Sequence, residues 1–425
     1  MNARERALDA QRKLNWFSNH ENGIVWARSW RATEGLPLGM RYAELGAARL
    51  AALDFLHDPE EPLIGRLAVP ELDPAENERA WEFIHASGVE LPGQTGHAEP
   101  YYDDLFALGL DGLREKAGGT PSFVRAAEGL SAMIERAAGQ AAAEEVAAAC
   151  RHIAHEPPAT FREAIQSMYI YQTCIFMEQN AASYNPGRMD QYLYPFYKAD
   201  IEAGRLTEEE AQELLDCLWV KFSEQCLFQD QVTAQFSAGY PMFQNVCCGG
   251  VDERGMDAVN DVSYLILQAT AEVQLYQPSL SVRYNMAKNP SSFLKKIAEV
   301  IKLGTGFPAF HNDEVGIEML LNKGIPLKEA YNWNPCGCVE TNLEGKQRCY
   351  TAYADFNLGS AVEFALLNGK SRKYGIQASE TTGDPTAFNT YEEFEEAVKE
   401  QIRYELRGTV ASSHVCDDIG FQRVV

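Results

Sequence analysis

Short extended runs alternate with amphipathic helices in the second half of the sequence. Leu280–Arg283 alternates apolar and polar residues, and a helical pattern follows over Ser291–Leu303. The extended run Pro308–Phe310 is followed in the same way by a helix over Asp313–Asn322. Apolar residues recur at every second position in a strand and at about every 3.6 positions in a helix. Strands that alternate with helices predict an α/β fold and argue against a helical bundle.

Helical patterns cover most of the remaining sequence. A capping box begins one of them, because the Thr207 hydroxyl can satisfy the amide of Glu210 while the Glu210 carboxylate reaches back. Further helices are predicted over Trp26–Leu56 with a break at Thr33–Pro37, and over Tyr101–Ala117, Ala126–His155, Ala159–Gln179 and Tyr391–Arg407. The predicted fold is therefore α/β and rich in helix.

The charge balance is strongly acidic, with 37 Lys and Arg against 61 Asp and Glu and a net charge of −24. Such a field repels phosphate backbones and anionic lipid, so neither nucleic acid nor a membrane is expected as a partner. The apolar runs, such as Val146–Cys150, are much shorter than a membrane span. Met1–Lys13 is charged and has no apolar signal region, so a cytoplasmic location is expected.

The sequence contains ten cysteines, and their spacing argues against a metal site. There is no C-x-x-C motif, and neither the pair Cys247 and Cys248 nor the pair Cys336 and Cys338 has a histidine or a second cysteine pair at zinc-ligand spacing. Four others lie in apolar helical patterns and are expected in the core, namely Cys150, Cys174, Cys217 and Cys226. Only the second pair lies in a segment rich in Pro, Gly and Asn, where chemistry is plausible.

The segment Asn334–Asn342 carries a thiol and a carboxylate two residues apart. Pro335 and Gly337 predict a loop here, and neither a helix nor a regular strand. In an extended backbone, residues i and i+2 point the same way, so Cys338 and Glu340 would share one face.

Cys338 and Glu340 suit a reaction in which a thiol exchanges a hydrogen atom while a carboxylate handles a proton. A thiolate mechanism would require a His or Lys beside the cysteine to lower its pKa. No histidine is close to Cys338 in sequence, although Lys346 and Arg348 are nearby. A buried structural thiol next to an unrelated carboxylate is the alternative that these residues leave open.

Four other polar segments could serve either a site or the fold alone. Arg188 and Asp190 follow a Pro-Gly turn, and we expect them to fix that loop through buried hydrogen bonds more than to line a pocket. His311–Glu314 could supply polar groups to a site or cap the helix that follows. His97 is expected to be structural. Gly304–Ala309 matches the dinucleotide pattern G-x-G-x-x-A, but a helix precedes it and a proline removes one amide, so a tight turn is expected.

The run Gly337–Glu340, with the sequence Gly-Cys-Val-Glu, resembles the active-site loop of the glycyl radical enzymes, the pyruvate formate-lyase superfamily. Further segments resemble the family in the same order along the chain, namely Thr33–Gly35, Gly93–His97, Pro186–Tyr192, Gly249–Asp252 and Leu303–Glu314. The resemblance implies that residues 1–425 form one pyruvate formate-lyase-type domain. It also implies half of a ten-stranded barrel, surrounded by many helices, with the cysteine on a central finger loop.

The same resemblance implies that Cys338 is the thiyl-radical cysteine and that Glu340 is its acid or base. No cofactor is expected to be bound in this chain. A backbone glycyl radical, made by a radical-SAM activating enzyme, takes the hydrogen atom of Cys338, and the thiyl radical then takes hydrogen from a small-molecule substrate. The family habit implies a homodimer. Substrate contacts are expected at Ser183, Tyr240, Phe243, His311 and Asn312.

The radical glycine of the family lies in an Arg-Val-x-Gly-Tyr loop near the C-terminus of a longer chain, and this sequence has no such loop. Ser237–Tyr240 resembles its last residues, but this segment precedes the finger loop and lacks the Arg-Val pair. We therefore expect the domain to be incomplete at its C-terminus, without the glycyl radical domain, and to be inactive as this chain alone.

The Cys-x-Glu spacing resembles the lyases of the superfamily, because pyruvate formate-lyase itself has two adjacent cysteines in this loop. Thr341–Lys346 and Asp355–Ser360 resemble the arylacetate decarboxylases, which implies decarboxylation of an arylacetate such as 4-hydroxyphenylacetate. Two alternatives stay open. One is cleavage of a C–O, C–N or C–S bond in a diol, choline, hydroxyproline or isethionate, and the other is an inactive fragment or subunit that lacks the radical glycine.

Overall fold

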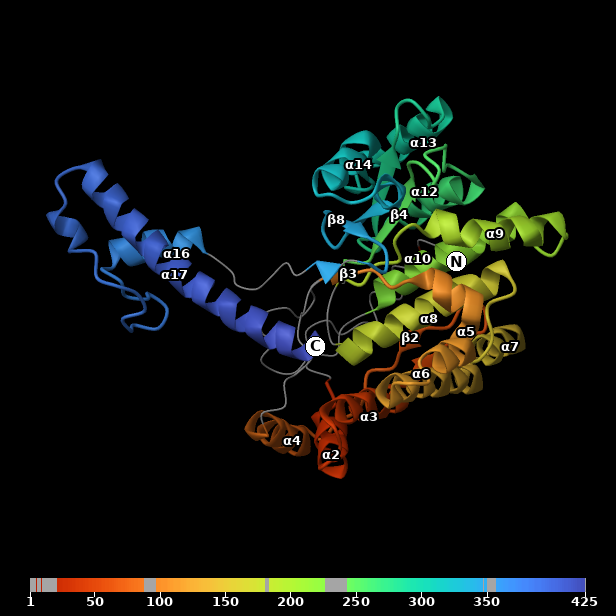
Figure 1. Ribbon diagram of the computed structural model, residues 1–425, viewed down its shortest axis with the longest axis horizontal. Coiled ribbons are helices and arrows are strands. Elements are labelled where there is room, and N and C mark those ends of the chain that lie inside the picture. The colour runs from red at the N-terminus through yellow and green to blue at the C-terminus, as the bar shows by residue number, and fades with distance from the viewer. Residues whose placement is uncertain are drawn as a thin grey trace. The chain divides into compact units, whose positions relative to one another are not determined.

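The computed structural model describes residues 21–87, 97–179, 183–225, 243–346, 348–349 and 357–424, together with residues 5 and 9. The chain divides into two compact units, Met1–Cys349 and Tyr350–Val425 (Figure 1). Cys338 and Glu340 lie in the first unit.

Most of the first unit is helical. Its helices are α2 (Gly23–Ala32), α3 (Leu38–Ala51), α4 (Pro74–Ala86), α5 (Tyr102–Lys116), α6 (Pro121–Gln140), α7 (Glu144–Ile153), α8 (Phe161–Gln179), α9 (Met189–Glu202), α10 (Glu208–Glu224), α12 (Asp261–Val273), α13 (Ser291–Ile301), α14 (Asp313–Asn322) and α15 (Leu327–Ala330). Helices α8 and α10 meet in the core, where the buried rings of Tyr169 and Phe222 pack edge to face with their centroids 5.6 Å apart. Such aromatic pairs contribute mainly through the apolar area that they remove from water.

The helix predictions hold in most places. The capping box of α10 is confirmed, since the Glu210 amide donates to Thr207 Oγ1 at 3.2 Å and the Thr207 amide donates to Glu210 Oε2 at 2.8 Å. The predicted break at Thr33–Pro37 separates α2 from α3. The single helix predicted over Ala126–His155 is wrong, because the chain turns between α6 and α7, where the amide of Ala142 donates to His57 Nδ1 at 2.9 Å. That partner is distant in sequence, so no local pattern announces the break.

Three parallel strands form the central sheet of the first unit. They are β4 (Asn245–Gly249), β5 (Ser279–Tyr284) and β6 (Ala309–Asn312), in the order β4-β5-β6. Helix α12 connects β4 to β5, and α13 connects β5 to β6, so the predicted α/β alternation is confirmed. Strand β4 is buried throughout, as expected for a parallel strand with both faces covered. A parallel bridge from Gly187 to Val246 continues the sheet beyond β4.

The remaining strands that the structure describes in the first unit form three antiparallel pairs. These pairs are β1 (Phe55–Leu56) with β2 (Arg66–Leu67), β3 (His97–Ala98) with β9 (Arg348–Cys349), and β7 (Trp333–Cys336) with β8 (Glu340–Leu343). We call the last pair and its turn, Trp333–Leu343, the finger hairpin. The prediction of an irregular loop is wrong for its two arms, which pair as strands. Pro335 is tolerated there because β7 pairs with β8 alone among the described strands, so a missing amide need not break a ladder.

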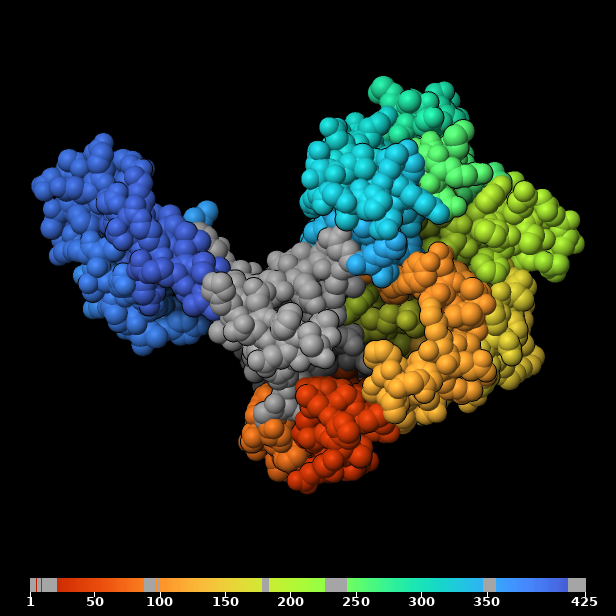
Figure 2. Space-filling model, in the orientation of Figure 1, coloured from red at the N-terminus to blue at the C-terminus, as the bar shows by residue number. Residues whose placement is uncertain are grey.

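The helices and the sheet-bearing segments of the first unit share one hydrophobic core. In Figure 2 the orange segments, which include α5 and α6, lie below the sheet-bearing segments coloured green to cyan. Among the helices that the structure describes, none is both long and apolar enough to cross a membrane.

The second unit contains α16 (Leu358–Leu366), the 3-10 helix η1 (Pro385–Ala387) and α17 (Tyr391–Val424). Helix α17 is longer than the predicted Tyr391–Arg407. Its Gln401 is fully buried and donates to the carbonyl of Glu380 at 2.7 Å and to Thr382 Oγ1 at 3.1 Å. These bonds fasten the segment before η1 to α17.

Candidate active site

Cys338 lies in the turn of the finger hairpin, between the end of β7 and the start of β8. Its side chain is exposed, whereas six other cysteines of the described residues are buried, namely Cys150, Cys174, Cys217, Cys247, Cys248 and Cys336. Partial burial and the neighbouring carboxylate of Glu340 raise the pKa of the Cys338 thiol above its ordinary value. The sulfur is therefore accessible and protonated at neutral pH, which suits hydrogen-atom transfer better than attack by a thiolate.

Glu340 is the first residue of β8, opposite Cys336 in the strand register. Its Oε1 lies 2.7 Å from His97 Nδ1, and its Oε2 accepts a hydrogen bond from the Val339 amide at 3.0 Å. Burial alone would raise the pKa of Glu340, but these hydrogen bonds outweigh it and place the pKa below its ordinary value. Glu340 is therefore ionised at neutral pH and can accept a proton.

The two predicted residues are brought together, but not by the predicted geometry. Cys338 and Glu340 do not lie on one extended run, because the backbone turns at Gly337, which has a φ of +56°. Their proximity shows in the electrostatic effect of Glu340 on the thiol. The tight turn, and not strand alternation, places the thiol beside the carboxylate.

His97 is the site residue that the sequence did not reveal. We expected a structural role, but strand β3 places its imidazole against Glu340, from which it is separated by 243 positions. The same imidazole explains the need for glycine at position 337, since a Cβ there would lie 2.1 Å from His97 Nδ1. The segment Gly93–His97 stands out in the sequence only by its family resemblance, and its partner is set by tertiary structure.

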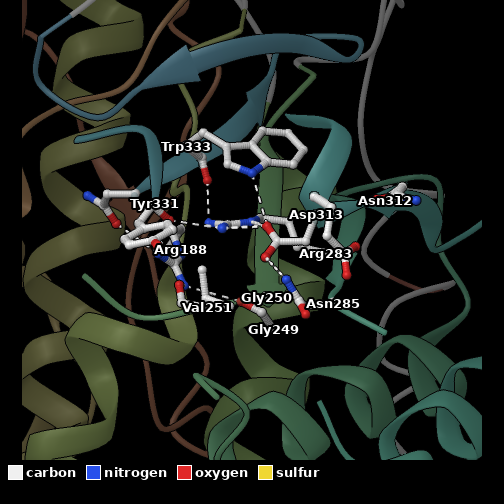
Figure 3. Close-up of polar contacts among 12 residues, drawn as sticks. Arg188, Gly249, Gly250, Val251, Arg283, Asn285, Asn312, Asp313, Tyr331 and Trp333 are labelled. Carbon is white, nitrogen blue, oxygen red and sulfur yellow. Dashed lines mark hydrogen bonds and ion pairs between the residues drawn. The ribbon is translucent and has the colours of Figure 1, made fainter. Parts of the chain in front are cut away.

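Two buried arginines hold the chain where it enters the finger hairpin (Figure 3). Arg283 donates to the carbonyls of Tyr331 at 2.9 Å and Trp333 at 2.5 Å, and its side chain pairs with Asp313 at 2.6 Å. Arg188 donates to the same Tyr331 carbonyl at 3.3 Å. Burial, and next the neighbouring Arg188, lower the pKa of Arg283 to about 10, so the guanidinium remains charged at neutral pH.

Arg188 also joins the hairpin to the sheet. It donates to the carbonyls of Gly249 at 3.2 Å and Val251 at 2.8 Å. Asp190 accepts from the Gly249 amide at 2.8 Å and from the Ser263 hydroxyl at 2.6 Å. The prediction that both residues fix their loop through buried hydrogen bonds is confirmed, although each uses partners in other segments.

The residues predicted to contact substrate differ in how far their side chains are buried. Asn312 caps α14, since its Oδ1 accepts from the Val315 amide at 3.1 Å, and it is exposed. His311 is half-buried beside Trp333 with ring centroids 6.1 Å apart, and burial followed by Arg283 lowers its pKa. Ser183 is fully buried with a φ of +66°, and Phe243 is partly buried.

Tyr240 lies outside the described residues. The substrate roles of all five residues stay predictions. Among the residues that the structure places, no group of three or more His, Cys, Asp or Glu could hold a metal ion.

Comparison with known proteins identifies the family. The model of the pyruvate formate lyase-like family matches residues 90–420. The isethionate sulfite-lyase of Bilophila wadsworthia is 38% identical over 267 residues, which covers 62% of this chain and 32% of that protein. The 4-hydroxyphenylacetate decarboxylase glycyl radical subunit of Clostridioides difficile is 34% identical over 274 residues, covering 59% of this chain and 30% of that protein. The chain thus spans about a third of the length of these curated relatives.

A solved structure described under 1,2-propanediol dehydration in Roseburia inulinivorans shares the fold. The TM-score is 0.79 at 26% sequence identity, and the match covers 97% of this chain and 63% of that one. The helix-rich architecture with its partial parallel sheet is accordingly part of a glycyl radical enzyme barrel. This chain belongs to the pyruvate formate lyase-like family and is related to the glycyl radical enzymes within it.

Proposed function

We propose that this chain is the part of a glycyl radical lyase that presents a reactive thiol and an acid–base group to a small-molecule substrate. The observation that carries the proposal is the position of the exposed Cys338 thiol beside Glu340, whose pKa the bond from His97 helps to lower. A protonated thiol and a deprotonated carboxylate are the two states that coupled hydrogen-atom and proton transfer requires.

The roles of the residues follow from these states. A glycyl radical on another segment would supply the unpaired electron, and a radical-SAM activating enzyme would generate that radical. Cys338 gives up the hydrogen atom of its Sγ–H bond, and the sulfur then takes a hydrogen atom from a substrate carbon. Glu340 accepts a proton from the substrate, and His97 keeps its carboxylate oriented and charged. The hydrogen atom taken from the substrate restores the Sγ–H bond. The product radical then takes a hydrogen atom from that bond, which leaves the unpaired electron on the sulfur again.

Cleavage of a carbon–heteroatom bond is the reaction class that we place first. The similarity to an isethionate sulfite-lyase, at 38% identity, supports a substrate in which a C–S or C–O bond is adjacent to a carbon that bears hydrogen. An ionised Glu340 suits removal of a hydroxyl proton from such a substrate. Decarboxylation of an arylacetate is the second candidate, supported by the similarity to the decarboxylase subunit and by the sequence Thr341–Lys346.

The test uses a longer protein that contains this chain and its glycyl radical segment, activated anaerobically. We expect turnover with isethionate, a diol or hydroxyproline, whereas turnover of 4-hydroxyphenylacetate alone would support the second candidate. Cys338→Ser should abolish turnover and leave the glycyl radical signal in EPR unchanged, because only the hydrogen-atom carrier is lost. Cys336→Ser is the matched control and should retain most of the activity. Turnover by Cys338→Ser would overturn the proposal.

A further inference from the structure

Two buried asparagines hold Gly337, the residue before Cys338, on both sides of its backbone. Asn185 Oδ1 accepts a hydrogen bond from the Gly337 amide at 3.3 Å. Asn245 Nδ2 donates to the Gly337 carbonyl at 3.1 Å. Both asparagine side chains are buried, so water competes poorly for these bonds. We call this pair the asparagine clamp.

The clamp is fastened to the central sheet. Asn245 is the first residue of β4, and its own amide donates to Asn185 Oδ1 at 2.8 Å. The loop that carries Asn185 is held against β4, because the Cys247 amide donates to the Gly187 carbonyl at 2.7 Å. A displacement of Gly337 would therefore require the breaking of bonds to a strand that is buried along its whole length.

Asn185 also contacts the end of the first hairpin arm. Its Nδ2 donates to Cys336 Sγ at 2.8 Å and to the Ser183 carbonyl at 2.9 Å. Cys336 is fully buried and faces the clamp, whereas Cys338 is exposed. The Asn185 side chain thus holds both Cys336 and Gly337, the two residues that precede Cys338.

The turn needs such support because of its own residues. Glycine in the left-handed region has more backbone freedom to lose on folding than any other residue, and Gly337 has a φ of +56°. On the far side of the thiol, His97 fixes Glu340. The residues on both sides of Cys338 are therefore held by hydrogen bonds, Gly337 by the asparagine clamp and Glu340 by His97.

We propose that Asn185 and Asn245 are positioning residues that set the place of the Cys338 sulfur relative to Glu340. The inference rests on the proposed function for its catalytic meaning, but its structural content can be measured without turnover. A misplacement of about 1 Å can cost on the order of a hundredfold in rate when reacting atoms must be aligned. The clamp acts on this alignment through the backbone of Gly337.

Hydrogen exchange in the 425-residue chain is the first test. Asn245→Ala removes the side-chain bond from Asn245 to Gly337, and we expect exchange of the amides at 337–339 to become about tenfold faster, as loss of a buried hydrogen bond implies. Asn289→Ala is the matched control, because Asn289 is also buried and joins the Gly250 carbonyl at 2.7 Å to Asp257 at 2.7 Å. The control should leave exchange in the turn at the wild-type rate.

Equal exchange at 337–339 in Asn245→Ala and Asn289→Ala would overturn the proposal. The unchanged chain provides a second measurement that does not depend on the folding of any variant. Its Gly337 amide, which donates to Asn185, should exchange about tenfold more slowly than a freely solvated amide. Exchange at the free rate would also overturn the clamp.

Activity separates the clamp from the proposed function. In the longer activated protein, Asn245→Ala should lower kcat about tenfold or more with little change in KM, while the glycyl radical signal stays at its wild-type intensity. Faster exchange in the turn, together with no turnover by the unmodified enzyme on any substrate tested, would retain the clamp and reject the lyase. Full turnover by Asn245→Ala, in an enzyme that Cys338→Ser inactivates, would reject the clamp and retain the lyase.

Discussion

At the scale of single residues, the site depends on the charge state of Glu340. Burial acts to neutralise this carboxyl group, and the bonds from His97 and the Val339 amide act to keep it charged. The second effect is larger, so the pKa of Glu340 lies below its ordinary value. The thiol beside it is shifted in the opposite sense, since burial and the Glu340 charge raise the pKa of Cys338. One turn thus carries a protonated thiol and an ionised carboxylate at neutral pH.

His97→Ala should raise the pKa of Glu340, because burial would then act with one fewer opposing hydrogen bond. A carboxyl group with a depressed pKa stabilises the folded state above its unfolded pKa, and this stability is lost as the pH falls through the folded value. The variant should therefore lose less stability than the wild type as the pH falls from about 5 to about 3, through the unfolded and folded pKa values of Glu340. Urea unfolding at several pH values measures the difference.

His97→Gln serves as the control for this prediction. Its amide can still donate to Glu340 but cannot carry a charge, so it should restore most of the pH dependence if the hydrogen bond is the larger effect. Identical pH profiles for the wild type and His97→Ala would show that His97 does not set the ionisation of Glu340.

At the scale of elements, the sequence predicted the two residues on the finger hairpin but not the residues that contact them from other segments. The residues that identify Cys338 and Glu340 lie within one short segment, and the loop predicted from its Pro and Gly is correct only for the turn at residues 337–339. The pairing of β7 with β8 was missed because a proline such as Pro335 argues against a regular strand. A two-stranded hairpin is a setting that tolerates a proline. His97, Asn185 and Asn245 reach the turn from separate segments. Such contacts follow from the tertiary fold and leave no local pattern.

Gly337→Ala tests the shape of the turn itself. An alanine at this φ of +56° costs about 1–2 kcal/mol in backbone strain, and its Cβ would lie 2.1 Å from His97 Nδ1. Gly304→Ala is the matched control, because Gly304 has a φ of +74° but an added methyl group would meet no described atom within 4 Å. We expect the free energy of unfolding to fall clearly further for Gly337→Ala than for Gly304→Ala. Equal losses would mean that His97 moves aside at no cost.

At the scale of the whole molecule, the alternation of strands and helices was enough to predict the α/β class. Leu280–Arg283 is the centre of β5, and Pro308–Phe310 overlaps the start of β6. What the alternation could not show is how the sheet is tied to the finger hairpin. The charged residues that make this connection, Arg188, Arg283 and Asp313, are all buried. The sequence predicted burial for Arg188 from its Pro-Gly turn, but nothing marked Arg283 or Asp313 as exceptions to the usual exposure of Arg and Asp. Their burial is possible only because each one finds partners in other segments.

Asp313→Ala should therefore destabilise the first unit more than any exposed change. Asp313 is the buried counter-ion of Arg283, and Arg188 is a second positive charge near Arg283. Removal of one partner from a buried pair leaves an uncompensated charge, which costs about 3–5 kcal/mol of unfolding free energy. Lys328→Ala is the control, since its 3.6 Å contact with Glu253 is exposed and should contribute about 0–1 kcal/mol. Urea unfolding at neutral pH compares the two variants, and similar losses would show that the buried cluster does not hold the sheet and the hairpin together.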